Sequence, residues 1–346
     1  MIIDVWHDCD PGHDDAIALM YCLSEPNINL VGISTVHGNQ ESYKTFMNAI
    51  RILYITGNIS MVKNLKVIAG ANKPIKRKSQ ICEEIHGQSG LGGVNWEEID
   101  KKIEALGINL KEGEKQNIED VVDGIHNAYE TSKNGRLTIL VTGCHTNIAA
   151  YAQKYPDDIK SGNINVVAMG GSVDTYGNTG PWSEFNIQID PEAFDIVLKA
   201  FQTKNKKSLV TLIPLEVTHT VLSTPDVIDK LDKNNKFENL IINLLLFFKE
   251  SYKNVFNFSS PPVHDPVAAY YIVHPEDFEV KHEQAVVETE GKYTSGTICI
   301  NRYPSVGDWC DANEFKELDI CRKVNVNKFW DDVIKHLHIL AKQSPL

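Results

Sequence analysis

Four aspartates stand within eight residues near the start of the chain. They are Asp8, Asp10, Asp14 and Asp15. The apolar run before them, residues 2–6, predicts a buried strand, and the apolar spacing of residues 16–23 predicts a helix after a Pro-Gly turn. One aspartate at a helix start is usually a cap, but capping does not explain four carboxylates around one turn. So much negative charge at one place indicates catalysis or a hard cation held by oxygen ligands.

Three other segments carry groups that can do chemistry. The loop at 178–186 is rich in neutral hydrogen-bonding side chains and has one acid, which suits either the binding of a polyol or turn formation. His264 precedes Asp265, and this pair fits either a site or a structural histidine. His86 falls in a long polar segment, where either a mobile acid or a solvated loop side chain is expected.

Strand and helix patterns alternate along most of the chain. Strands are expected at 30–36, 66–69, 137–141, 164–168 and 209–213, with a late strand pair at 277–290 and 297–301. Helices are expected at 41–57, between the strands at 137–141 and 164–168, near 225–233, at 237–256 and at 329–341. This alternation predicts an α/β fold with a single doubly wound, mostly parallel sheet, in one domain spanning 1–346. Residues 70–117 are expected to form a long active-site loop.

Polar clusters follow several of the expected strands. They are the aspartate cluster, residues 37–39, residues 142–147 and residues 169–171. In a doubly wound sheet, ligands bind outside the carboxyl ends of the strands. The topology therefore predicts that these clusters meet at one edge of the sheet.

The composition narrows the class of protein. The chain has 346 residues, 42% of them hydrophobic, and a net charge of −12, which argues against nucleic acid or an anionic membrane as partner. No apolar run is long enough to span a bilayer, and the chain opens directly on a strand pattern without a cationic leader. The seven scattered cysteines show no Cys-x-x-Cys motif, which favours reduced thiols. We therefore expect a cytoplasmic protein.

The ordered motifs of the chain resemble those of the inosine-uridine preferring nucleoside hydrolases. The matching segments are Asp8–Ala16, Gly38–Asn39, Ile85–Gly87, Thr142–Gly143, Thr146–Asn147, Met169–Gly171, Glu184–Asn186, Asp190–Ala193, Pro214–His219 and His264–Pro266. They cover nearly the whole chain in the order of the family, and the segments at 214–224 and 329–331 also resemble the fungal uridine nucleosidase branch. The resemblance implies a Rossmann-like nucleoside hydrolase fold.

The resemblance also implies a site for Ca²⁺ and a ribonucleoside. The implied metal ligands are Asp10, Asp15, the backbone carbonyl of Thr142, and Asp265. Asp10 is then the general base, Asp14 and Asn39 hold ribose hydroxyls, and Met169, Asn178, Glu184 and Asn186 hold the 3′ and 5′ side. His264 or His86 is the implied acid for the departing base. Homodimers or homotetramers are expected, since family members commonly form them.

Several alternatives remain open at this point. The alternatives for the base of the nucleoside are uracil, another pyrimidine, a purine and nicotinamide. The alternative to an enzyme is a catalytically silent nucleoside-binding protein, which would have the same motifs. A phosphatase of the Asp-x-Asp type is disfavoured, because Pro11 and Gly12 follow Asp10 and no phosphate loop is visible. Phe248, Tyr252 and Phe256 share one face of the helix expected at 237–256; base stacking is one interpretation, and core packing is favoured.

Overall fold

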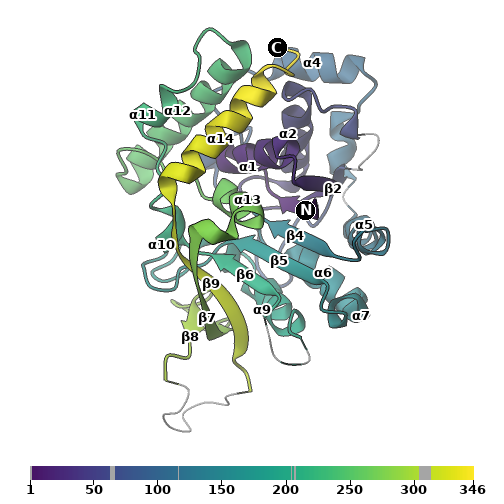
Figure 1. Ribbon diagram of the computed structural model, residues 1–346, viewed down its shortest axis with the longest axis vertical. Coiled ribbons are helices and arrows are strands. Elements are labelled where there is room, and N and C mark those ends of the chain that lie inside the picture. Colours follow the sequence, from purple (N-terminus) through teal and green to yellow (C-terminus); the bar gives the residue numbers. More distant parts are fainter. Residues whose placement is uncertain (1, 63–66, 116, 204, 206–207, 304–312) are drawn as a thin grey trace.

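A twisted sheet forms the centre of the molecule (Figure 1). The computed structural model describes residues 2–62, 67–115, 117–203, 205, 208–303 and 313–346, and within these ranges nine strands form one sheet in the order β3-β2-β1-β4-β5-β6-β9-β7-β8. The strands are β1 (Ile3–Cys9), β2 (Ile28–Thr35), β3 (Val67–Ala69), β4 (Leu137–Val141), β5 (Ile164–Met169), β6 (Val210–Ile213), β7 (Phe278–Val287), β8 (Ile298–Ile300) and β9 (Lys316–Val324). All pairs from β3 to β9 are parallel, while β7 runs antiparallel to both β9 and β8. The expected mostly parallel α/β sheet is confirmed.

Helices cover both faces of this sheet. The longer ones are α1 (His13–Ser24), α2 (Ser42–Ile55), α4 (Glu97–Ala105), α5 (Ile118–Glu130), α6 (Thr146–Lys154), α9 (Pro191–Ala200), α12 (Lys236–Phe256), α13 (Asp265–Val273) and α14 (Val326–Ala341). Short helices are α3 (Glu83–His86), α7 (Pro156–Lys160), α8 (Phe185–Gln188), α10 (Leu215–Thr218) and α11 (Pro225–Ile228), with 3₁₀ turns η2 (Leu110–Glu114) and η3 (Pro275–Asp277). Among the described residues, no helix combines the length and apolar character that crossing a bilayer requires.

The two faces have separate apolar cores. Helices α1, α2, α12, α13 and α14 share one buried cluster, while α5, α6 and α9 pack into another on the opposite face. Strand β1 lies between β2 and β4 and is buried from Asp4 to Cys9, as expected for a central parallel strand covered on both faces. The C-terminal helix α14, yellow in Figure 1, packs on α1 and α12.

Two expectations about local structure were wrong, and two further elements were not predicted. The segment 70–117 is not simply a loop, because it contains α3, α4 and η2. Helix α4 was not predicted because its buried stripe is only Ile99 and Ile103, one turn apart, in an otherwise acidic segment. The helix expected near 225–233 is only the four residues of α11. Strand β9 and helix α13 were not predicted, since β9 carries charged residues throughout and α13 is apolar all round.

Candidate active site

Two helix starts face each other at the carboxyl edge of the sheet. Asp14 and Asp15 occupy the first turn of α1, and Asp265 is the first residue of α13. Each offers a carboxylate oxygen, and these three oxygens lie within 4.8 Å of one another. The backbone amide of His264 also donates to Asp14 Oδ2 at 3.2 Å, across 250 positions of sequence. Helix N-termini favour anions, so the fold supplies partial positive charge where these carboxylates gather. Together they form a group of oxygen ligands that can hold a metal ion.

Asp15 is held in place by four hydrogen bonds. Its Oδ2 accepts from the Gly12 amide at 3.0 Å and from Asn39 Nδ2 at 2.9 Å. Its Oδ1 accepts from the Thr142 hydroxyl at 2.8 Å and from the Asp10 amide at 3.3 Å. The donors come from the segments after β1, β2 and β4, three neighbours in the sheet, so the edge itself orients this carboxylate.

Asp10 has one oxygen without a partner. Its Oδ2 accepts from the Asn39 amide at 2.7 Å, but its Oδ1 is buried and makes no hydrogen bond. A side chain at Gly143 would place a Cβ 2.7 Å from Oδ1, and one at Gly38, where φ is +156°, would collide with Oδ2. Both positions therefore need glycine. A buried carboxylate oxygen left unpaired is costly, and a cation or a water at this position would satisfy it. The donor set fits a hard cation.

Burial and mutual repulsion raise the pKa values of these acids. Burial, and then the charge of Asp15, raises the pKa of Asp14 to about 7 and that of Asp10 well above its usual range. Burial, and then the charges of Asp14 and Asp15, raise the pKa of Asp265 well above its usual range. No lysine or arginine is found among the described residues that line the adjoining cavity. The carboxylates can therefore ionise together only if a cation compensates them.

The carboxylates border a cavity of about 250 Å³. Ten of the residues predicted for the site line it: Asp14, Asn39, His86, Thr142, Met169, Asn178, Glu184, Asn186, His264 and Asp265. Asp10 and Asp15 are not part of the lining; they are completely buried and contact it through Asn39 and Thr142. The structure thus brings together every residue proposed from the sequence.

Hydrogen bonds orient the side chains on the polar side of the cavity. Glu184 caps α8, with Oε1 accepting from the Asn186 amide at 2.9 Å and Oε2 from the Gly171 amide at 2.9 Å. The Asn186 amide group donates to the carbonyl oxygens of Thr142 (3.0 Å) and Met169 (3.3 Å). Burial raises the pKa of Glu184 to about 7. These groups are fixed before any ligand arrives, which suits the binding of hydroxyl groups.

His264 is hydrogen-bonded at both ring nitrogens. Nδ1 lies 2.7 Å from the Thr218 hydroxyl and Nε2 lies 2.8 Å from the Tyr252 hydroxyl. Burial lowers the pKa of His264 well below its usual value, so the ring is neutral at pH 7. A neutral imidazole has one donor and one acceptor nitrogen, so one hydroxyl donates to the ring and the other accepts from it.

His86 is clamped against the start of α1. Its Nδ1 lies 3.3 Å from the backbone nitrogen of His13, the first residue of that helix, and 3.1 Å from His13 Nδ1. The two rings stack with centroids 5.3 Å apart, and His13 Nε2 lies 3.0 Å from the Gly92 carbonyl. Burial, and then the neighbouring His13, lowers the pKa of His86 well below its usual value. His86 is therefore a buried, neutral ring at the cavity wall and not a solvated loop side chain.

The favoured interpretation of the α12 aromatics as core residues was incomplete. Phe248, Tyr252 and Phe256 line the cavity, although Phe248 and Tyr252 are also buried. The spacing of four residues in the sequence indicated that these three aromatic side chains share one face of the helix. Only the packing of α12 against α3 shows that this face borders a cavity. Other lining residues were missed because they lie in the segment expected to be a loop: Gln80, Ile81, Cys82, Glu84 and Ile85.

Comparison with known proteins identifies the family. A family model of the inosine-uridine preferring nucleoside hydrolases matches residues 5–331. The chain belongs to this family. It is similar to a probable ribonucleoside hydrolase of Dictyostelium discoideum, at 33% identity over 96% of this chain and 94% of the relative. It is also 31% identical to the pyrimidine-specific ribonucleoside hydrolase RihA of Citrobacter koseri, over 92% of this chain and 95% of that one.

The fold comparison agrees with the sequence comparison. A purine-preferring ribonucleoside hydrolase from Gardnerella vaginalis superposes with a TM-score of 0.78 at 25% identity, covering 98% of this chain and 99% of that one. The resemblance seen in the sequence motifs is confirmed, as is the nucleoside hydrolase fold. This member of the nucleoside hydrolases is accordingly a ribonucleoside hydrolase, an enzyme that cleaves an N-glycosidic bond.

Proposed function

We propose that this chain hydrolyses uridine and related pyrimidine ribonucleosides to ribose and the free base, with Ca²⁺ as its cofactor. The observation that carries the proposal is the unpartnered Oδ1 of Asp10, buried beside the oxygen cluster of Asp14, Asp15 and Asp265. An unpaired carboxylate oxygen next to a cation site is suited to holding and deprotonating a water molecule.

Asp10, Asp15, Asp265 and the backbone carbonyl of Thr142 would hold the ion. All four donors are oxygens, which suits calcium better than a metal that prefers nitrogen or sulfur. When bound, the ion would supply positive charge that orients the ribose diol and acidifies a nearby water. The chain's own residues supply everything else.

Asp10 would act as the general base. Asn39 holds its Oδ2, so Oδ1 is the oxygen that remains to accept a proton. The absence of a side chain at Gly143 leaves room beside that atom. The attacking water would therefore stand between Asp10 and the anomeric carbon of the sugar.

The ribose would bind against the acidic floor of the cavity. Asp14 and Asn39, which line the cavity, would hold the 2′- and 3′-hydroxyls, and Met169, Asn178, Glu184 and Asn186 would hold the 3′ and 5′ side. Cleavage of the glycosidic bond builds positive charge on the ribose. Fixed carboxylates close to that charge lower the barrier, because they need no reorganisation during the reaction.

The leaving base would meet the opposite wall, where aromatic side chains and two histidines stand. Phe248 and Phe256 offer flat apolar surface, while His86, or His264 with its partner Tyr252, offers a proton or a hydrogen bond. Uracil leaves poorly as an anion, so a pyrimidine substrate depends on that help.

The pyrimidine preference is supported by the relatives named pyrimidine-specific, whereas the compared structure from Gardnerella vaginalis is named purine-preferring. The test is a kcat/KM panel over uridine, cytidine, inosine and nicotinamide riboside, run after exhaustive chelation and again with Ca²⁺ restored. We expect no hydrolysis without metal, recovery with Ca²⁺ and the highest kcat/KM for uridine. Full activity of metal-free protein would refute the cofactor, and a higher value for inosine would refute the base preference.

We also propose a homodimer or homotetramer in the cytoplasm, with a small-molecule ribonucleoside as the partner and neither nucleic acid nor membrane. Sedimentation equilibrium of the purified protein tests the oligomeric state. A mass of one chain at all concentrations would exclude it.

A further inference from the structure

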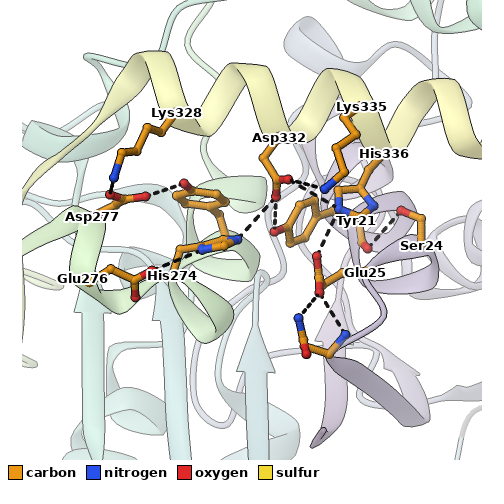
Figure 2. Close-up of polar contacts among 12 residues, drawn as sticks. Tyr21, Ser24, Glu25, His274, Glu276, Asp277, Lys328, Asp332, Lys335 and His336 are labelled. Atoms are coloured by element: carbon orange, nitrogen blue, oxygen red, sulfur yellow. Dashed lines mark hydrogen bonds and ion pairs between the residues drawn. The ribbon is translucent and has the colours of Figure 1, made fainter. Parts of the chain in front are cut away.

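A second group of metal-ligating side chains lies between α1 and α14 (Figure 2). Glu25 directly follows α1, and Asp332 and His336 lie on α14. Glu25 is at the opposite end of α1 from Asp14 and Asp15, and a helix of twelve residues is about 18 Å long. The group is therefore separate from the active-site carboxylates.

The spacing of the three side chains suits a single ion. Asp332 and His336 are four residues apart on one helix, which places them on the same face. His336 Nε2 lies 3.0 Å from Glu25 Oε2 and 3.7 Å from Asp332 Oδ1, and one ligand atom from each residue lies within 4.8 Å of the others. Ligands at roughly 2.0–2.2 Å from one ion are separated from each other by about 3–4 Å.

The imidazole of His336 has no hydrogen-bond partner. The side chain is 1% exposed, and neither ring nitrogen makes a hydrogen bond, although Glu25 Oε2 is only 3.0 Å away. His336 Nε2 and Glu25 Oε2 are as close as the atoms of an ion pair, but they are not oriented as a hydrogen bond requires. Two ligands of one ion show this arrangement, since each points at the ion and not at the other ligand. Buried polar atoms without partners are rare and call for an unseen water or ion.

The remaining carboxylate oxygens are already oriented by neighbours. Glu25 Oε1 accepts from the backbone and side-chain nitrogens of Asn27, at 2.9 and 2.8 Å, and Asp332 Oδ2 accepts from the Tyr21 hydroxyl at 2.8 Å. Such outer hydrogen bonds hold the ligands of known metal sites in place. Figure 2 shows the contact of Tyr21 with Asp332, and Glu25 and Asp332 both facing Nε2 of His336.

Two other side chains compete for Asp332. Lys335 Nζ lies 3.0 Å from Oδ1, and His274 Nε2 lies 3.5 Å from Oδ2. The Lys335 side chain is 63% exposed, so it can turn into solvent when another cation takes its place. His274 contacts the oxygen that Tyr21 already holds, so it does not block the ligand atom.

We propose that Glu25, Asp332 and His336 form a site for a divalent transition ion of the Zn²⁺ class, with water completing the coordination. One imidazole nitrogen with two carboxylate oxygens suits such an ion better than Ca²⁺ or Mg²⁺, which take oxygen ligands. The bound ion would tie α14 to the end of α1, the helix whose other end carries Asp14 and Asp15. The site would stabilise the position of that helix and take no part in the reaction.

The test uses the full chain saturated with Ca²⁺, so that the active-site carboxylates are occupied, and titrated with Co²⁺ as a spectroscopic probe. We expect one equivalent of Co²⁺ to bind with a visible absorption band, and Zn²⁺ to displace it. His336→Gln should weaken Co²⁺ binding at least about tenfold, and Lys335→Gln should strengthen it. The matched control is His338→Gln, which removes a partly exposed histidine of the same helix that pairs with Glu238; it should bind Co²⁺ like the wild type.

Uptake of no Co²⁺ by the Ca²⁺-loaded wild type would overturn the proposal, and this result does not depend on any variant folding correctly. Equal binding by the wild type and His336→Gln would overturn it as well, because the ion would then lie elsewhere. If His336→Gln does not fold, Glu25→Gln takes its place in the same comparison. None of these readouts measures hydrolysis, so the outcome is independent of the proposed activity.

Discussion

The hydroxyl of Tyr252, a residue of α12, lies 2.8 Å from Nε2 of His264, and both side chains line the cavity. On the other side of the ring, the Thr218 hydroxyl lies 2.7 Å from Nδ1 and 3.5 Å from the Leu215 carbonyl, to which it donates. Thr218 then accepts from Nδ1–H, and Tyr252 donates to Nε2. In this tautomer Nε2 carries no proton, so the Tyr252 hydroxyl is the donor on this side of the ring and can turn from Nε2 toward the leaving base. His264 itself can donate only after Nε2 has gained a proton and Tyr252 has turned away.

Replacement of Tyr252 distinguishes these two routes. If the Tyr252 hydroxyl donates to the leaving base, Tyr252→Phe should lower kcat for uridine by roughly a hundredfold, the usual contribution of a general acid. It should spare p-nitrophenyl riboside, whose leaving group needs no proton. The measurement is kcat for both substrates. An unchanged or higher kcat on uridine would show that Tyr252 only covers His264.

His86 is the second candidate acid, and a substitution tests it separately. His86→Gln should lower kcat for uridine by about tenfold or more and leave p-nitrophenyl riboside unaffected, since its neutral ring can only donate a hydrogen bond to the base. The control is His126→Gln, at a histidine that pairs with Asp158 away from the cavity. If kcat fell for both substrates together, the change would instead have disturbed the start of α1, which His86 contacts.

The role of Asp10 predicts a large catalytic defect. Asp10→Asn keeps the size of the side chain but removes the base, so kcat should fall at least about a hundredfold while the protein remains folded. Circular dichroism checks folding, and stopped assays with uridine measure kcat. A variant that retains near-normal kcat would exclude Asp10 as the base.

The sugar contacts predict strong discrimination against deoxyribose. Asp14 and Asn39 are fixed at the cavity floor, so a substrate without the 2′-hydroxyl leaves polar partners unsatisfied. A site built around a hydroxyl can reject its absence by roughly 10⁴-fold in kcat/KM. Comparison of uridine with 2′-deoxyuridine measures this ratio. Equal values would contradict the proposed binding mode.

The raised pKa values predict a pH-dependent stability that calcium reverses. The pKa of Asp14 in the folded protein is about 7, above its unfolded value, and burial raises the pKa values of Asp10 and Asp265 well above their usual range. The folded metal-free protein therefore holds extra protons, and its free energy of unfolding should fall as the pH rises from 6.5 to 8. The buried histidines, whose folded pKa values are lowered, oppose this trend until the unfolded histidines are deprotonated, roughly one unit above their ordinary value of about 6.5, so the fall should be clearest in the upper part of this range.

With Ca²⁺ the trend should flatten, because the ion binds the ionised carboxylates and proton loss then favours binding. Thermal unfolding of chelated and Ca²⁺-loaded protein at pH 6.5, 7.2 and 8.0 provides the comparison. The stabilisation by Ca²⁺ should grow with pH. A stabilisation that shrinks over this range would contradict the proposal that these carboxylates bind the ion.

The sequence alone determined the sheet and the edge at which the candidate site residues gather. Alternating strand and helix patterns predicted a parallel sheet, and polar residues after β1, β2, β4 and β5 predicted that these side chains meet at one edge of it. Such patterns are local, because a strand or helix shows its buried face within a few residues. The four aspartates near the N-terminus could be identified for the same reason, since they surround one turn.

Tertiary structure alone decided which partners these residues have. The His264 amide contacts Asp14 across 250 positions, and His336 meets Glu25 only because α14 packs on the end of α1. From the sequence, Tyr252 was predicted to be a core residue, and only the packing of α12 shows that its hydroxyl contacts His264. Contacts of this kind depend on how far each helix is rotated and shifted against its neighbours. That position is set by the whole core, and no single segment of the sequence carries it.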